Sequence, residues 1–316
     1  MNGVRGPWWR HVRGAMVAYL ELTKIRLAAL VLLTTFVGFV FRSGSTIDLG
    51  LLAWTLFGTG LTAAGSLALN QWIEAGRDAL MERTRMRPIP AGLIRPRMAV
   101  GTGFALTVLG VATLALKTNL LTAALGLLVV LIYVVAYTPL KPVSSLCTLV
   151  GAFCGAIPPL MGWTAAGSLA RGGWILATIL FVWQIPHFLA IAWIYREDYV
   201  RGGFRMLPAY DPSGSATSRM VVLYSAALLP ISLGLTAARL TGWVYSVGAA
   251  TLGLSLLYLG ITLYRSRTHA AARRLFLGSV LYLAALIALM IVDRNPDPQT
   301  TDRDHVALLV SADGSW

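Results

Sequence analysis

Residues 49–78 read LGLLAWTLFGTGLTAAGSLALNQWIEAGRD, a 25-residue uncharged run followed by two acids and an arginine. An α-helix needs about 20 apolar residues to cross the roughly 30 Å hydrocarbon core of a bilayer. The uncharged run over residues 49–73 is long enough for one such crossing. We therefore expect the polar residues at its end to lie at one membrane surface.

Eight further charge-free runs, 15 to 29 residues long, repeat this pattern. They cover residues 27–41, 98–116, 118–140, 142–170, 172–195, 220–238, 240–264 and 275–292. None shows the alternating polarity of a membrane strand. The sequence predicts an all-α integral membrane protein of about nine transmembrane helices over residues 27–292. Residues 1–26 are expected to form a cytoplasmic N-terminal segment, and residues 293–316 a flexible outer tail.

The composition excludes a water-soluble globular domain. Among 316 residues, 57% are apolar and 12% are charged, and the mean hydropathy is +0.70; soluble domains carry about 25% charged residues. The formal net charge of +13 is a topology signal, because 20 of the 26 Lys and Arg residues fall on the side of the N-terminus if spans alternate. The positive-inside rule then predicts the N-terminus inside and the C-terminus outside, with no role for nucleic acid.

The polar residues after the run over 49–73 repeat at helical spacing. Asn70, Glu74 and Asp78 are four residues apart, so they share one face of a helix. An amide oxygen and two carboxylates are ligands that Mg²⁺ accepts together with waters and substrate phosphates. The alternative is that these are interfacial anchors paired with arginines, but two acids at this spacing repel each other unless a cation lies between them.

Three cations near these acids are candidate phosphate ligands. Arg83 and Arg87 lie just beyond and are again four residues apart, and an arginine binds phosphate oxygens with two parallel hydrogen bonds. We expect Pro88 to end the helix that carries them. Lys141 is a lone charge between two uncharged runs, and its alternative role is that of an interfacial lysine between packed helices.

A second polar cluster follows the run over residues 172–195. Adjacent acids point to different faces of a helix, so only one of Glu197 and Asp198 is expected to bind metal, and we favour Asp198. His187 is the one ionisable residue inside this run, and ionisable groups at membrane depth are functional candidates. The alternatives are a solvated loop and a structural histidine.

These motifs resemble those of the UbiA superfamily of intramembrane prenyltransferases, over about residues 22–292. Its haem-farnesylating branch is the most similar. The resemblance rests on the spacing of the first polar cluster and on Trp183-x2-Pro-His-Phe, Tyr195-Arg-x-Asp-Tyr and Gly202-Gly-x2-Met-Leu-Pro. Glu74 stands where many members have Asp, and Pro142 replaces an Arg that often follows the lysine.

The resemblance implies transfer of a farnesyl group from farnesyl diphosphate to a vinyl group of haem B. Water addition then gives haem O and releases diphosphate. It implies Mg²⁺ as the cofactor, a bacterial inner-membrane location, and haem A synthase or terminal oxidase assembly factors as partners. The implied catalytic and metal-binding residues are Asn70, Glu74, Asp78 and Asp198; the implied diphosphate-binding residues are Arg83, Arg87, Lys141 and Arg196; the implied haem-binding residue is His187.

Two other functions remain open from the residues alone. A quinone-pathway aromatic polyprenyltransferase shares the chemistry, but His187 is not expected in it. A multi-span transporter places its polar groups near the bilayer midplane, whereas most polar residues here lie at the inner ends of the spans.

Overall fold

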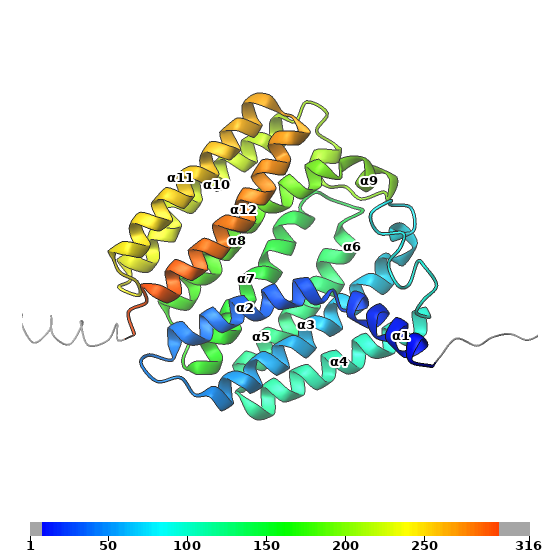
Figure 1. Cartoon of the computed structure of the whole chain (residues 1–316), viewed down its shortest axis with the longest axis horizontal. Coiled ribbons are helices and arrows are strands. Elements are labelled where there is room, and N and C mark those ends of the chain that lie inside the picture. The colour runs from blue at the N-terminus through cyan, green and yellow to red at the C-terminus, as the bar shows by residue number, and fades with distance from the viewer. Residues whose placement is uncertain (1–7, 297–316) are drawn as a thin grey trace, which may run out of the picture.

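The computed structural model describes residues 8–296, and nine of the helices in this range are long and apolar enough to cross a membrane. This confirms the predicted all-α architecture (Figure 1). The elements are α1 (Trp8–Leu22), α2 (Ile25–Arg42), α3 (Leu49–Asp78), α4 (Pro96–Lys117), α5 (Leu120–Leu131), the π-helix η1 (Ile132–Tyr137), α6 (Thr138–Leu140), α7 (Cys147–Ala166), α8 (Arg171–Ile194), α9 (Arg196–Arg201), the 3-10 turn η2 (Leu207–Ala209), α10 (Ser215–Ala237), α11 (Trp243–Ser266) and α12 (His269–Val292).

The ends of the chain differ in detail from the expectation. The first span, α2, has 18 residues and so extends beyond the 15-residue uncharged run. Part of the predicted N-terminal segment forms α1, a helix that packs against α3. Helix α12 ends at Val292, where the tail was predicted to begin. Most of that tail, residues 297–316, lies outside the described residues.

Helices α7 and α8 lie at the centre of the bundle. In the most apolar 18-residue stretch of α7, 72% of the residues are buried, compared with 22% in α4, which presents a wide face to lipid. Helix α7 packs tightly on α2 because Gly162 has no side chain: a Cβ atom there would overlap the Thr35 carbonyl oxygen. Small residues allow this close approach of membrane helices.

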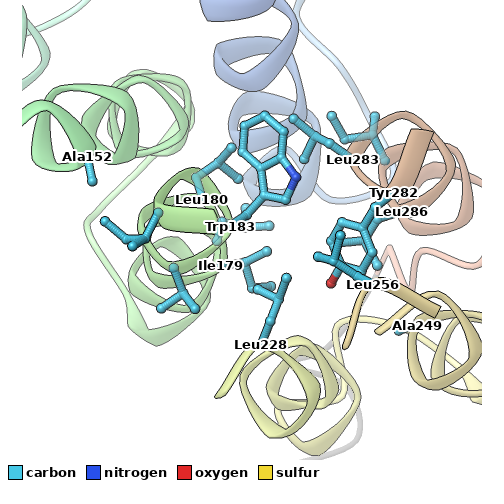
Figure 2. Close-up of a cluster of buried hydrophobic side chains, with 14 of the residues drawn as sticks. Ala152, Ile179, Leu180, Trp183, Leu228, Ala249, Leu256, Tyr282, Leu283 and Leu286 are labelled. Carbon is cyan, nitrogen blue, oxygen red and sulfur yellow. The ribbon is translucent and has the colours of Figure 1, made fainter. Parts of the chain in front are cut away.

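Helices α8, α10, α11 and α12 enclose a hydrophobic cluster, in which Trp183 on α8 lies among leucines from its neighbours (Figure 2). The Trp183 indole Nε1 donates a hydrogen bond to the Ser279 carbonyl oxygen on α12 at 2.8 Å. A buried indole N–H needs such a partner. This bond fixes the positions of α8 and α12 relative to each other.

Helix α1, helix α9 and the loop after α3 gather at one end of the bundle (Figure 1). The fourth span, Leu120–Leu140, consists of α5, η1 and α6 and also ends there. Its backbone is π-helical over Ile132–Tyr137. The Thr138 hydroxyl donates to the Tyr133 carbonyl oxygen, five residues earlier, at 2.7 Å. The wider turn places Thr138 beside α3, and π-turns of this kind occur often at functional sites.

Candidate functional site

The predicted row of Asn70, Glu74 and Asp78 forms one face of the last turns of α3. All three side chains are buried, with residue exposures of 0%, 4% and 0%. The Asn70 Nδ2 donates a hydrogen bond to the Thr138 hydroxyl at 3.0 Å, so its Oδ1 is the atom that faces the site. Two carboxylates buried side by side require compensating positive charge.

Three cations from three different elements supply that charge. The pairs are Lys24 Nζ with Asn70 Oδ1 at 2.7 Å, Lys141 Nζ with Glu74 Oε1 at 2.6 Å, and Arg87 Nη1 with Asp78 Oδ2 at 2.7 Å. Burial lowers the pKa of Lys141, but its interactions with Glu74 and the nearby Tyr133 together outweigh burial and raise that pKa. The structure therefore brings the predicted Lys141 and Arg87 onto the predicted row.

One oxygen of the row has no partner. Within residues 8–296, Asp78 Oδ1 is buried and accepts no hydrogen bond. Leaving a buried acceptor unsatisfied costs about 1–3 kcal/mol, and a divalent cation or a water would satisfy it. A free hard oxygen beside an amide oxygen and a second carboxylate fits Mg²⁺. Among the described residues, no three His, Cys, Asp or Glu side chains are grouped as a metal site, so Asp198 does not join the row here.

Asp198 instead organises the loop that follows α3. One of its oxygens accepts the Glu82 backbone N–H at 3.1 Å, and the other accepts the Arg83 backbone N–H at 3.3 Å. Arg201 also donates to it. Burial opposes ionisation of this carboxyl, but these hydrogen bonds outweigh it and lower the pKa of Asp198. Of the two adjacent acids, Asp198 is buried and Glu197 is exposed.

The expectation that the helix continues to Pro88 is wrong. Helix α3 ends at Asp78, and residues 79–94 form successive turns. The Thr84 hydroxyl donates to the Asp78 carbonyl oxygen at 2.9 Å, and Asp198 takes backbone N–H groups that a continuing helix would use itself. The Thr84 bond satisfies one of the carbonyl groups that the end of the helix leaves free, and Asp198 satisfies two N–H groups of the loop.

The predicted Arg83 stacks on two tyrosines. Its guanidinium carbon lies 4.5 Å from the Tyr195 ring centroid and 5.5 Å from that of Tyr199, and Nη2 donates to the Tyr199 hydroxyl at 3.2 Å. Arg83 lines three separate cavities at this end of the bundle. One of them, of about 590 Å³, also contains the predicted Arg196, which is exposed and lies away from the acid row.

Lys24 was missed as a site residue. It lies between α1 and α2 in a left-handed backbone conformation, with φ of 46°. It also lines a cavity of about 620 Å³ together with Arg87 and Arg83. Burial, followed by the nearby Arg87, lowers the pKa of Lys24 to about 7. In the sequence it reads only as an interfacial anchor, because nothing local shows that the turn brings it to Asn70.

His187 lies in the other half of the bundle, on α8. Its Nδ1 is 2.8 Å from the Ser279 hydroxyl. Its ring lies between Trp183, at 4.8 Å between centroids, and Phe276, at 5.2 Å. The structure thus separates His187 from the acid row and places it against α12.

Comparison with known proteins identifies the family. Residues 31–289 match the UbiA prenyltransferase family. A protoheme IX farnesyltransferase of Solibacter usitatus is 43% identical over 286 residues, covering 87% of this chain and 98% of that one. The mitochondrial protoheme IX farnesyltransferase of Homo sapiens is 41% identical, and the match covers 87% of this chain and 62% of the human one.

Solved structures agree on the fold. A digeranylgeranylglyceryl phosphate synthase superposes with a TM-score of 0.73 at 17% identity, over 88% of this chain and 98% of that one. A UbiA homologue from Archaeoglobus fulgidus, bound to GPP and Mg²⁺, gives a TM-score of 0.66 at 17% identity, over 86% and 99%. The chain is therefore a multi-pass membrane protein that belongs to the UbiA prenyltransferase family.

Proposed function

We propose that this protein is an Mg²⁺-dependent prenyltransferase that farnesylates haem B. A farnesyl group passes from farnesyl diphosphate to a haem vinyl group, water is added, and haem O and diphosphate are the products. The observation that carries the proposal is the cation-paired row on α3, in a chain 43% identical over 286 residues to a protoheme IX farnesyltransferase.

The chemistry needs positive charge around a leaving group. When the allylic C–O bond of the substrate breaks, its electron pair leaves with the diphosphate, and a carbocation remains on the farnesyl chain. Bound Mg²⁺ would neutralise the developing negative charge. We assign Asn70, Glu74 and Asp78 as its ligands, since they offer an amide oxygen and two carboxylates on one face. Asp198 is proposed as a fourth ligand after it exchanges its present loop contacts.

The cations now on the row have a second role in this proposal. Lys141 and Arg87 hold the acid oxygens in the absence of metal, and they turn to the diphosphate when metal takes those oxygens. Fixed donors in a dry site stabilise developing charge strongly because they do not reorganise during the reaction. Arg83 and Arg196 are proposed to complete the diphosphate contacts.

The acceptor side of the reaction is assigned to α8. The haem vinyl group attacks the farnesyl carbocation, the resulting cation on haem takes up water, and that water loses a proton. His187 is the proposed haem-binding residue, which would ligate the iron or hold a propionate. We also propose a bacterial inner-membrane location and haem A synthase or terminal oxidase assembly factors as partners, since haem O needs further conversion or insertion.

Mass analysis of haems extracted from a bacterial host that makes no haem O tests the proposed function. Expression of this chain should give a haem whose mass has increased by a farnesyl group and one hydroxyl group. Asp198→Asn should abolish the product, whereas Glu197→Gln, a change at the exposed neighbour, should retain it. Farnesylated aromatic acids without farnesylated haem, or no prenylated product at all from folded protein, would refute the proposal.

A further inference from the structure

A cavity of about 590 Å³ lies between the inner end of α8 and the start of α12. Its basic side chains are Arg83, His269 and Arg273, and no acid lines it. The remaining wall is apolar and aromatic, and Tyr195 and Phe276 are part of it. A site of this composition fits an anion with a large apolar body.

The basic side chains on the α12 side are free to bind a ligand. Within residues 8–296, the side chains of Arg273 and His269 form no hydrogen bond or ion pair with the protein, and both residues are exposed. By contrast, Lys141 and Arg87 are each paired with an acid of the row on α3. Unpaired arginines facing an apolar wall are suited to bind carboxylates, because the guanidinium fork matches the two oxygens of a carboxylate.

The side chains of α12 change in character with depth. Arg273 lies near the inner end, Phe276 follows almost one turn deeper, and Ser279, which bonds to His187, lies about 9 Å from Arg273 along the helix axis at about 1.5 Å per residue. On α8, His187 and Ile191 are four residues apart and share a face. The cavity therefore extends from the basic Arg273 to Phe276, whose ring lies 5.2 Å from that of His187 between centroids.

We propose that this cavity is the haem subsite, in which Arg273 and His269 bind the two propionates and Phe276 contacts the macrocycle. This inference deepens the proposed function and rests on it. Haem is a planar apolar ring with both carboxylates at one edge and both vinyl groups at the opposite edge. Carboxylates held by Arg273 and His269 place the vinyl edge deeper, toward His187.

The arrangement keeps the two substrates distinct. Diphosphate needs a metal, and the cavity between α8 and α12 has no acid to hold one. The acid row lies on the other side of Arg83, which lines both this cavity and the one containing Lys24 and Arg87. Both substrates then keep their anionic ends at the inner surface and their reacting carbons deeper among the helices.

Binding titrations on purified full-length protein in nanodiscs test this subsite without turnover. The ligands are protohaem IX and its dimethyl ester, which lacks the carboxylates, and empty nanodiscs correct for partition into lipid. Wild-type protein should bind the diacid more tightly. Arg273→Glu should weaken diacid binding by about tenfold, as loss of a charge-assisted contact implies, and leave ester binding unchanged. Arg274→Glu, the adjacent exposed residue outside the cavity, is the matched control.

Three results would overturn the subsite. They are equal affinity of wild-type protein for diacid and ester, equal effects of the two arginine variants, and an Arg273→Glu effect that disappears when phosphatidylglycerol in the nanodisc is replaced by a zwitterionic lipid. The last result would identify a lipid headgroup as the ligand. None of these three results contradicts the proposed function. That proposal is refuted by a different result, namely expression that yields no farnesylated haem.

Discussion

Replacing Lys141 by Met removes the partner of a buried carboxylate. Lys141 Nζ lies 2.6 Å from Glu74 Oε1, and the two side chains are only 11% and 5% exposed. The ammonium also lies 4.5 Å from the Tyr137 ring centroid. Methionine preserves most of the length and the apolar packing of the side chain, so the charge is the main quantity that changes.

The expected loss of stability follows from this burial. Removing one partner of a buried ion pair costs about 3–5 kcal/mol, because the remaining charge is left without compensation. Lys24 also acts electrostatically on Glu74 and offsets part of this cost, so we expect the lower end, about 3 kcal/mol. The double variant Glu74→Gln/Lys141→Met removes both charges of this pair and should return to within about 1 kcal/mol of wild type.

Thermal unfolding in detergent, followed by fluorescence-detected size-exclusion chromatography, measures this cycle without added metal. The Lys141→Met protein should unfold well below wild type and the double variant close to it, while neither makes haem O. Added Mg²⁺ should stabilise Lys141→Met more than wild type, because a divalent cation replaces the lost charge. Additive single effects, or an unchanged unfolding temperature for Lys141→Met, would refute the reasoning.

Three further predictions concern the row, the helix packing and a loop. Asp78→Asn should lower haem O formation by about 10²–10³-fold even at high Mg²⁺, because the charge of the proposed metal ligand is lost. The protein should still elute normally in size-exclusion chromatography, since the amide keeps the contact with Arg87. Wild-type rates would exclude Asp78 as a ligand. Gly162→Ala should lower folded yield sharply because its Cβ would overlap α2, whereas Gly101→Ala, where nothing lies within 4 Å, should not; equal yields would contradict the packing. Hydrogen bonds to Asp211 outweigh burial and lower the pKa of its carboxyl. The ionised carboxylate therefore stabilises the folded protein fully above pH about 4, and this contribution is lost at lower pH. Asp211→Asn should flatten the decline of the unfolding temperature at acid pH, and an unchanged decline would contradict this.

The spans and the acid row follow from local sequence. Charge-free runs of membrane length identify the nine spans, and a spacing of four residues is enough to place Asn70, Glu74 and Asp78 on one face. Both properties depend on residues within one helix. Adjacent residues on a helix diverge, and Asp198 is buried while Glu197 is exposed; the assignment of Asp198 as a metal ligand stays a prediction.

The partners of these residues depend on distant contacts and were not predictable. Helix α3 ends at Asp78 because Asp198, more than a hundred residues later, binds the following backbone N–H groups. Lys24 reaches Asn70 because, in the turn between α1 and α2, it adopts a left-handed backbone conformation. Periodicity within a single segment carries no information about either contact.

The π-helix η1 determines the direction in which the side chains that follow it in the fourth span point. A π-turn contains one residue more than the α-helical turn it replaces, so each later side chain is rotated by about 100° relative to an uninterrupted α-helix. Thr138 and Lys141 contact α3 only in this rotated phase. Deleting a single residue within 132–137 would restore the regular helix, keep the hydrophobic length almost unchanged, and turn both side chains away from the acids.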